Sequence, residues 1–100
     1  MQTLDLSTMQ ENAEQAELLL TLLANRNRLM ILCSLIEEEK SVGQLVSISP
    51  LSQSAVSQHL AKLRDASVVR TRREGQTIFY AIKSKEVEAV INTLYELYCS

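Results

Sequence analysis

Residues 51–82 constrain the fold of this chain most, because an amphipathic helix pattern is followed directly by a hairpin pattern. Val56, Leu60 and Leu63 recur at the i, i+4, i+7 spacing that places side chains on one helix face. The runs 68–73 and 77–82 then indicate two strands joined by a turn. This order predicts a winged helix-turn-helix.

The other face of this predicted helix is polar, small and nearly free of acidic residues: Ser54, Ser57, Gln58, Ala61 and Lys62. Hydroxyl and amide groups can pair with base edges in the major groove of DNA, where acidic groups are disfavoured. Three arginines cluster on the first strand of the hairpin and near its tip: Arg70, Arg72 and Arg73. Helix face and hairpin together predict a DNA-binding surface.

Charge is distributed unevenly along the chain, whose net charge of −2 is unusual for a DNA-binding domain. Residues 52–83 have six basic and two acidic side chains, a net charge of +4, whereas residues 1–51 have −4 and residues 84–100 have −2. A solvated surface explains any single arginine, but basic residues gathered on the helix and hairpin favour phosphate contact. A homodimer would double this salt-dependent attraction.

One hundred residues, 46% of them hydrophobic, indicate a single globular domain over residues 1–100, with more apolar surface than a small monomer usually buries. No apolar run approaches the roughly 18–20 residues of a membrane span, and the N-terminal residues do not resemble a signal peptide. We therefore expect a cytoplasmic protein that does not bind membranes. The sequence has only two glycines, too few for a glycine-rich loop that binds phosphate.

The other segments predict a helical frame, in the order α-α-α-α-β-β-α. The first helix is expected to end near Leu23, the acidic run 37–40 to end the second in solvent, and the third to end near Ile48. The second helix should bury Leu29, Leu32, Cys33 and Ile36. Polar residues that can cap a helix start precede each helix: Ser7 or Thr8, Asn25 or Asn27, Ser41, Ser52 and Ser84.

These segments resemble the ArsR/SmtB family of small dimeric winged-helix repressors over about residues 12–99, most specifically in LSQSAVSQHL. The resemblance implies a homodimer on an imperfect palindrome in double-stranded operator DNA. Helix contacts are implied at Gln53, Ser54, Ser57 and Gln58, and wing contacts at Arg72, Arg73 or Gln76. His59 and Lys62 complete the predicted DNA-binding set. Packing of the first and last helices across the two-fold axis implies an interface at Leu18, Leu22, Val90, Ile91, Leu94 and Leu97.

Cys33 and Cys99, in an ILC segment and a YC ending, resemble the persulfide-sensing BigR/HlyU-like branch of that family. The resemblance implies that reactive sulfur species or oxidants cross-link the two cysteines and release the operator. The negative end of the last helix raises the pKa of a nearby thiol, which favours Cys33 as the attacking thiolate, assisted by Arg26 or Arg28. The plainer alternative is that Cys33 is an inert core residue.

Other function classes are weaker or remain open. Metal-binding family members use a cysteine-rich third helix or a His, Asp and Glu set on the last helix, and this chain has neither, so we expect no metal and no cofactor. A repressor with a metal or another inducer remains an alternative, as does a winged-helix protein-interaction module. An enzyme is not expected, because there is no C-x-x-C motif and the single histidine lies on the predicted DNA-binding helix.

Overall fold

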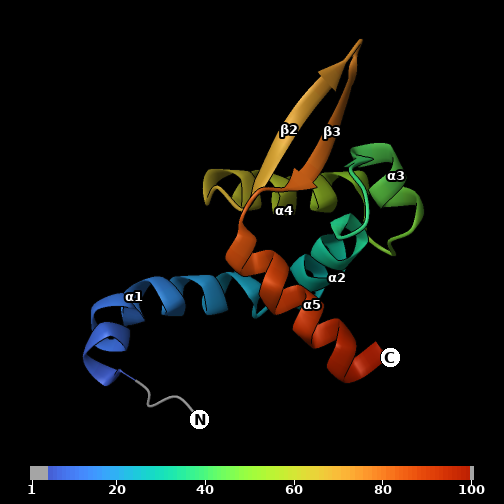
Figure 1. Ribbon diagram of the computed structural model, residues 1–100. Helices are drawn as coiled ribbons and strands as arrows, with labels where there is room; N and C mark the ends of the chain where they lie inside the picture. The colour runs from blue at the N-terminus through green and yellow to red at the C-terminus, as the bar shows by residue number, and fades with distance from the viewer. Residues whose placement is uncertain (1–4, 100) are drawn as a thin grey trace.

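The computed structural model describes residues 5–99 and has the predicted winged-helix order with one short strand added (Figure 1). Its elements are α1 (Leu6–Leu23), α2 (Arg26–Leu35), β1 (Lys40–Ser41), α3 (Val42–Ser47), α4 (Gln53–Asp65), β2 (Val69–Glu74), β3 (Thr77–Ile82) and α5 (Lys85–Cys99). The three strands form an antiparallel sheet in the order β1-β3-β2. The winged helix-turn-helix prediction is therefore confirmed.

Strand β1 was not predicted, and it changes the role of the acidic segment before it. Lys40 pairs with Tyr80 and Ser41 with Phe79, so this part of the chain is held against the wing instead of ending in solvent. The Lys40 ammonium also donates to the Ser34 carbonyl at 2.6 Å. Two residues are too few for a strand periodicity to be visible in a sequence. Only the pairing with β3 makes them a strand.

Helix starts follow the predicted caps with one correction. Ser52 and Ser84 accept from the backbone N–H groups of Ala55 and Val87, and Asn25 caps α2. Ser41 and Gln44 form a reciprocal capping box. The cap of α1 is Asp5, not Ser7 or Thr8, because its carboxylate accepts from the backbone N–H groups of both residues.

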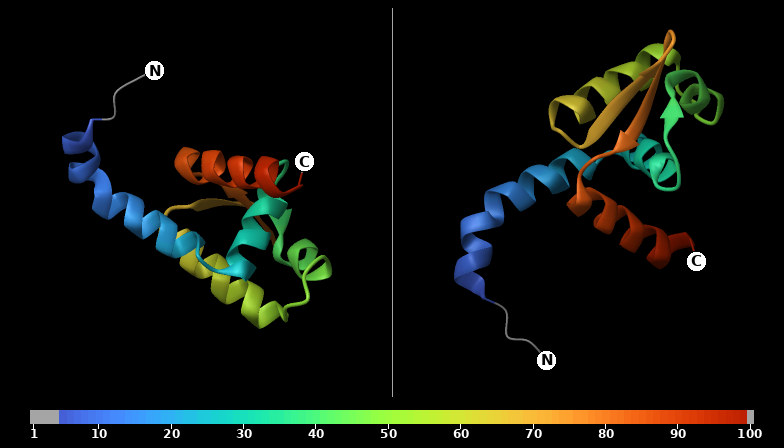
Figure 2. Two further views of the ribbon diagram at one scale, coloured as in Figure 1. Left: turned by 90° about the horizontal axis from the view of Figure 1, so that it is seen from below. Right: turned by 45° about the horizontal axis from the view of Figure 1, so that its top comes forward.

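The core joins α2, α4 and α5, with α2 lying between the other two (Figure 2). Val56, Leu60 and Leu63 of α4 are fully buried, as their spacing predicted. The buried face of α2 is rotated from the predicted one: Ile31, Leu32 and Leu35 are buried, whereas Leu29, Cys33 and Ile36 are only partly buried. The prediction assumed one buried face, whereas α2 is covered on two sides, by α4 and by α5. A helix packed between two others buries a broader stripe than one apolar face.

Helix α1 and the hairpin extend from this core in different directions (Figure 1). Within residues 5–99, Leu23 is the only residue of α1 that is buried. No single described helix has the length and hydropathy of a membrane span; α1 and α2 reach it only when taken together, and they meet at 94°. The exposed length of α1 distinguishes it from the helices of the core.

Candidate nucleic-acid interface and cysteine pair

The outer face of α4 presents the four side chains that the sequence predicted to contact bases. Gln53, Ser54, Ser57 and Gln58 are all exposed, while the opposite face of the helix is locked into the core. Among residues 5–99, none of these four side chains has a hydrogen-bonding partner, so their donors and acceptors are available. The helix thus combines a rigid inner face with a polar outer face of the kind that fits a major groove.

A tight turn sets the direction in which the wing leaves α4. The N–H of Val68 donates to the Leu63 carbonyl at 2.9 Å, and the N–H of Ser67 donates to the Arg64 carbonyl at 2.9 Å. This pair of bonds is a Schellman motif, in which the residue after the cap takes the left-handed conformation. Ser67 does so with φ of 60°, although glycine is the usual residue there. The missing glycine explains why the sequence did not reveal this turn.

The hairpin is regular from Val69 opposite Ile82 to Glu74 opposite Thr77. Gly75 turns the chain with φ of 61°, in space where an added Cβ would meet nothing within 4 Å. Arg70, Arg73 and Gln76 are exposed on this wing, and within residues 5–99 neither arginine makes an ion pair. Their charges are therefore available to a phosphate backbone.

Arg72, which the sequence predicted to contact phosphate, already has partners within the chain. Its guanidinium forms ion pairs with Glu39 and Glu74 and lies over the Phe79 ring, 4.7 Å from the centroid. The strand pattern placed Arg72 on the wing correctly. It could not indicate that a glutamate 33 residues earlier in the chain would lie against it.

His59 and Lys62 have charged or helical neighbours within the chain, unlike the four polar residues above. His59 is half-buried, and burial, followed by the charges of Arg28 and Lys62, lowers its pKa, which favours the neutral imidazole at neutral pH. Lys62 and Arg28 line a groove beside α1. Arg28 is itself buried and donates from Nε to the Leu22 carbonyl at 2.6 Å. DNA contacts from His59 and Lys62 stay predictions.

The residues predicted at the subunit interface differ in how exposed they are in the single chain. Leu18 and Leu97 are 63% and 69% exposed, so they are available to a partner. Leu22, Val90 and Leu94 are half-buried. Ile91 is corrected: it is fully buried in the core of the single chain, because it lies on the side of α5 that faces the core. The same two helices expose further large apolar side chains that the predicted interface omitted: Leu6, Met9, Leu20, Tyr95 and Tyr98.

The two cysteines are free thiols on helices that contact each other. Cys33 is half-buried on α2, and Cys99 is exposed as the last residue of α5. Burial raises the pKa of the Cys33 thiol, and the negative charge of the Cys99 thiolate raises it further. Activation of Cys33 by Arg26 or Arg28 is not seen: neither lowers this pKa, and the Arg28 side chain bonds to the Leu22 carbonyl.

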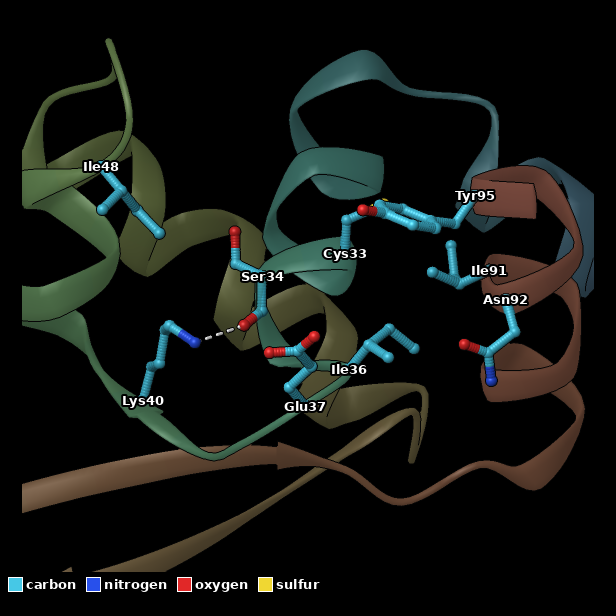
Figure 3. A pocket seen from close by; sticks show the side chains of 9 residues that line it. All are labelled: Cys33, Ser34, Ile36, Glu37, Lys40, Ile48, Ile91, Asn92 and Tyr95. Atoms are coloured by element: carbon cyan, nitrogen blue, oxygen red, sulfur yellow. Dashed lines mark hydrogen bonds between the residues drawn. The ribbon is translucent and has the colours of Figure 1, made fainter. Parts of the chain in front are cut away.

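Cys33 opens into a pocket of about 420 Å³ between α2 and α5 (Figure 3). Tyr95 and Ile91 line it from α5, and Lys40 lies at its far side with the ammonium on the Ser34 carbonyl. Among the described residues, no group of three or more His, Cys, Asp or Glu side chains could hold a metal ion.

Residues 25–71 match the family described as bacterial regulatory proteins of the arsR family. The transcriptional activator HlyU of Vibrio cholerae is 51% identical over 96 residues, which span 96% of this chain and 89% of that protein. The structure of reduced HlyU superposes with a TM-score of 0.88 at 52% identity, over 93% of this chain and 98% of HlyU. The transcriptional repressor BigR of Xylella fastidiosa superposes with a TM-score of 0.89 at 34% identity, over 97% and 99%. These names are those of DNA-binding regulators, not enzymes.

Proposed function

This chain belongs to the ArsR family of bacterial regulatory proteins, and from that membership we propose that it is a dimeric repressor which releases operator DNA when Cys33 and Cys99 are cross-linked. The observation that supports DNA binding most directly is the outer face of α4. Its polar groups are exposed and lack hydrogen-bonding partners within residues 5–99, and the wing that follows α4 in the chain exposes arginines. A protein-interaction module would need neither feature.

In the proposed complex, α4 enters the major groove and the wing lies along the phosphates. Gln53, Ser54, Ser57 and Gln58 would contact base edges, because their short polar side chains can both donate and accept. Five other side chains would contact the DNA phosphates around these bases: His59, Lys62, Arg70, Arg73 and Gln76. Phosphate contacts position the protein, whereas the base contacts select the sequence.

The proposed dimer uses the exposed apolar faces of α1 and α5. Leu18 and Leu97 would lie at its centre, because burying such side chains stabilises association, and half-buried Leu94 would extend the contact. A two-fold axis would then present two copies of α4 to successive major grooves, about 34 Å apart. Repression needs only that this dimer occupies its operator, and BigR is named a repressor.

Cys99 would react first in the proposed cross-link, because it is exposed whereas burial raises the pKa of Cys33. A persulfide R–S–SH transfers its outer sulfur to the Cys99 thiolate, which becomes Cys99–S–SH and releases R–S⁻. The Cys33 thiolate then attacks the Cys99 sulfur, forms a disulfide and expels HS⁻. If both cysteines first receive a sulfur, the Cys33 persulfide anion expels HS⁻ in the same way and leaves a trisulfide.

The cross-link would act through the two helices that bear the cysteines. Cys33 is on α2, whose buried face packs in the core with α4, and Cys99 ends α5, which is part of the proposed interface. Tying these helices together would rotate each α4 relative to the two-fold axis and change the half-site spacing. Allosteric coupling is typically about 1–3 kcal/mol, so operator affinity should fall roughly 5- to 150-fold.

Mass spectrometry and operator binding before and after treatment with a persulfide donor test this proposal. The wild-type protein should gain a bridge between Cys33 and Cys99 within one chain, lose affinity, and regain it after reduction by dithiothreitol. Cys33→Ser and Cys99→Ser should each bind DNA normally and fail to respond, since one thiol cannot close a bridge. Release of DNA from treated Cys99→Ser would exclude the cross-link mechanism.

A further inference from the structure

The guanidinium of Arg72 makes two-pronged contact with one carboxylate from outside the wing. Its Nε lies 2.9 Å from Oε1 and 3.2 Å from Oε2 of Glu39, and its Nη2 also donates to Glu39 Oε1. On the other side, Nη1 donates to Glu74 Oε2 at 2.8 Å. The face of the guanidinium lies over Phe79 of β3. Among exposed ion pairs, such bidentate and networked arrangements are the ones that hold a fixed geometry.

Glu39 comes from the segment that joins α2 to β1, so this contact connects the wing to the end of α2. β1 itself pairs with β3 through only two residues. A two-stranded hairpin is only marginally stable by itself, so contacts from outside the hairpin help to hold its position. The Glu39–Arg72 contact is therefore positioned to limit how far the hairpin can swing relative to α2 and α4.

Electrostatics argue against a phosphate as the partner of Arg72. Two carboxylates already pair with the guanidinium of Arg72, and a DNA phosphate would have to displace at least one of them. The bond to Arg72 lowers the pKa of Glu39, so the carboxylate is ionised throughout the neutral range. Arg73, the next residue on the same strand, has no ion pair among residues 5–99.

We propose that Glu39 and Arg72 form a latch that sets the angle of the wing, so that Arg72 positions the wing for DNA binding and does not itself bind phosphate. This inference rests on the proposed docking of the wing along DNA. It does not depend on the cysteines, because the latch is present with both thiols free. It assigns an acidic residue, Glu39, a positive contribution to binding a polyanion.

The sign of the Glu39→Gln effect on operator affinity tests the latch, with all measurements made on reduced protein. If Glu39 holds the wing, Glu39→Gln should weaken binding roughly 2- to 5-fold, the range expected for an exposed, well-formed ion pair. If Arg72 instead binds phosphate, removal of a competing carboxylate should strengthen binding. Glu37→Gln is the matched control, since it removes the same charge two residues earlier and should leave affinity equal or slightly higher.

Salt dependence and a conservative variant separate positioning from direct phosphate contact. Arg72→Gln should lower affinity without changing the slope of log K against log salt concentration, whereas Arg73→Gln should reduce that slope by about 1. Arg72→Lys should not restore affinity, because an ammonium cannot form the two-pronged bond. The double variant Glu39→Gln/Arg72→Gln should be no weaker than either single variant.

Stronger binding by Glu39→Gln, a slope reduced by Arg72→Gln, or full rescue by Arg72→Lys would each overturn the latch. None of these results bears on the cysteine cross-link, which is measured on treated wild-type protein. Conversely, a protein that ignores persulfide donors can still show the latch.

Discussion

The α4–wing half and the α1–α5 half of this molecule expose opposite kinds of surface. On α4, the large apolar side chains are fully buried, and the exposed side chains are polar or charged apart from the small Ala61. On α1 and α5, large apolar side chains such as Leu18 and Leu97 remain exposed. Segment 52–83 is basic, whereas the segments on either side of it are acidic.

The difference indicates which half is complete within one chain. Polar groups on α4 are satisfied by water until a ligand replaces it, so that surface needs no partner to be stable. Keeping apolar side chains in water costs free energy. A large exposed patch of them therefore marks an interaction surface. The comparison therefore predicts that the α1–α5 half needs a second copy of the chain, and that the α4–wing half needs DNA.

The largest effect is expected from Leu97→Glu, which tests the α1–α5 half. Leu97 is mostly exposed in the single chain, so the fold should survive, but a glutamate in an interface would be an unpaired buried charge. The dimer should dissociate, and operator affinity should fall by roughly 100-fold or more, because the second half-site no longer adds to the first. Sedimentation velocity measures the assembly state, and a binding titration measures the affinity.

Asn92→Glu is the control for this change, since Asn92 lies on the polar face of the same helix. It should leave both the dimer and operator binding intact. A wild-type protein that sediments as a monomer at micromolar concentration and still binds its operator would refute the comparison.

An intermediate effect is expected on the α4–wing half. Gln53→Ala or Ser57→Ala should each lower operator affinity by roughly 1–3 kcal/mol and relax base preference, because each removes a contact to a base edge. Arg73→Ala should instead weaken binding to all sequences alike, because phosphates are present at every position. Titrations against operator and scrambled DNA distinguish the two behaviours. Unchanged affinity in all three variants would remove the DNA assignment from this face.

The smallest effect is expected from removing one helix cap in each half. The free energy of unfolding is compared in the monomeric Leu97→Glu background. Ser52→Ala should lower the free energy of unfolding by about 1 kcal/mol, because α4 is part of the cooperative core. Asp5→Ala should not change it measurably, because the first turns of α1 are exposed and can fray without unfolding the core. Chemical denaturation followed by circular dichroism measures both. Equal losses would mean that α1 unfolds with the core.

Sequence patterns predicted the features that depend on neighbouring residues. The apolar stripe of α4, the hairpin over 68–82 and the caps at Ser41, Ser52 and Ser84 were all correct, since periodicity and capping operate within one or two turns. The errors involve residues far apart in the chain. Ile91 was assigned to an interface although the core buries it, and the ion pair between Arg72 and Glu39 was not foreseen, because an apolar face or an arginine on a strand does not reveal what packs against it.

By itself, the sequence determined the order of elements, the family and the polar outer face of α4. Only the tertiary structure decided how these elements use their side chains: it paired Arg72 with Glu39, added β1 to the wing, buried Ile91 in the core and raised the pKa of Cys33 by partial burial. The physical reason is one of range. Helix and strand periodicity act over a few residues, whereas burial and ion pairing depend on which distant segments the fold brings into contact.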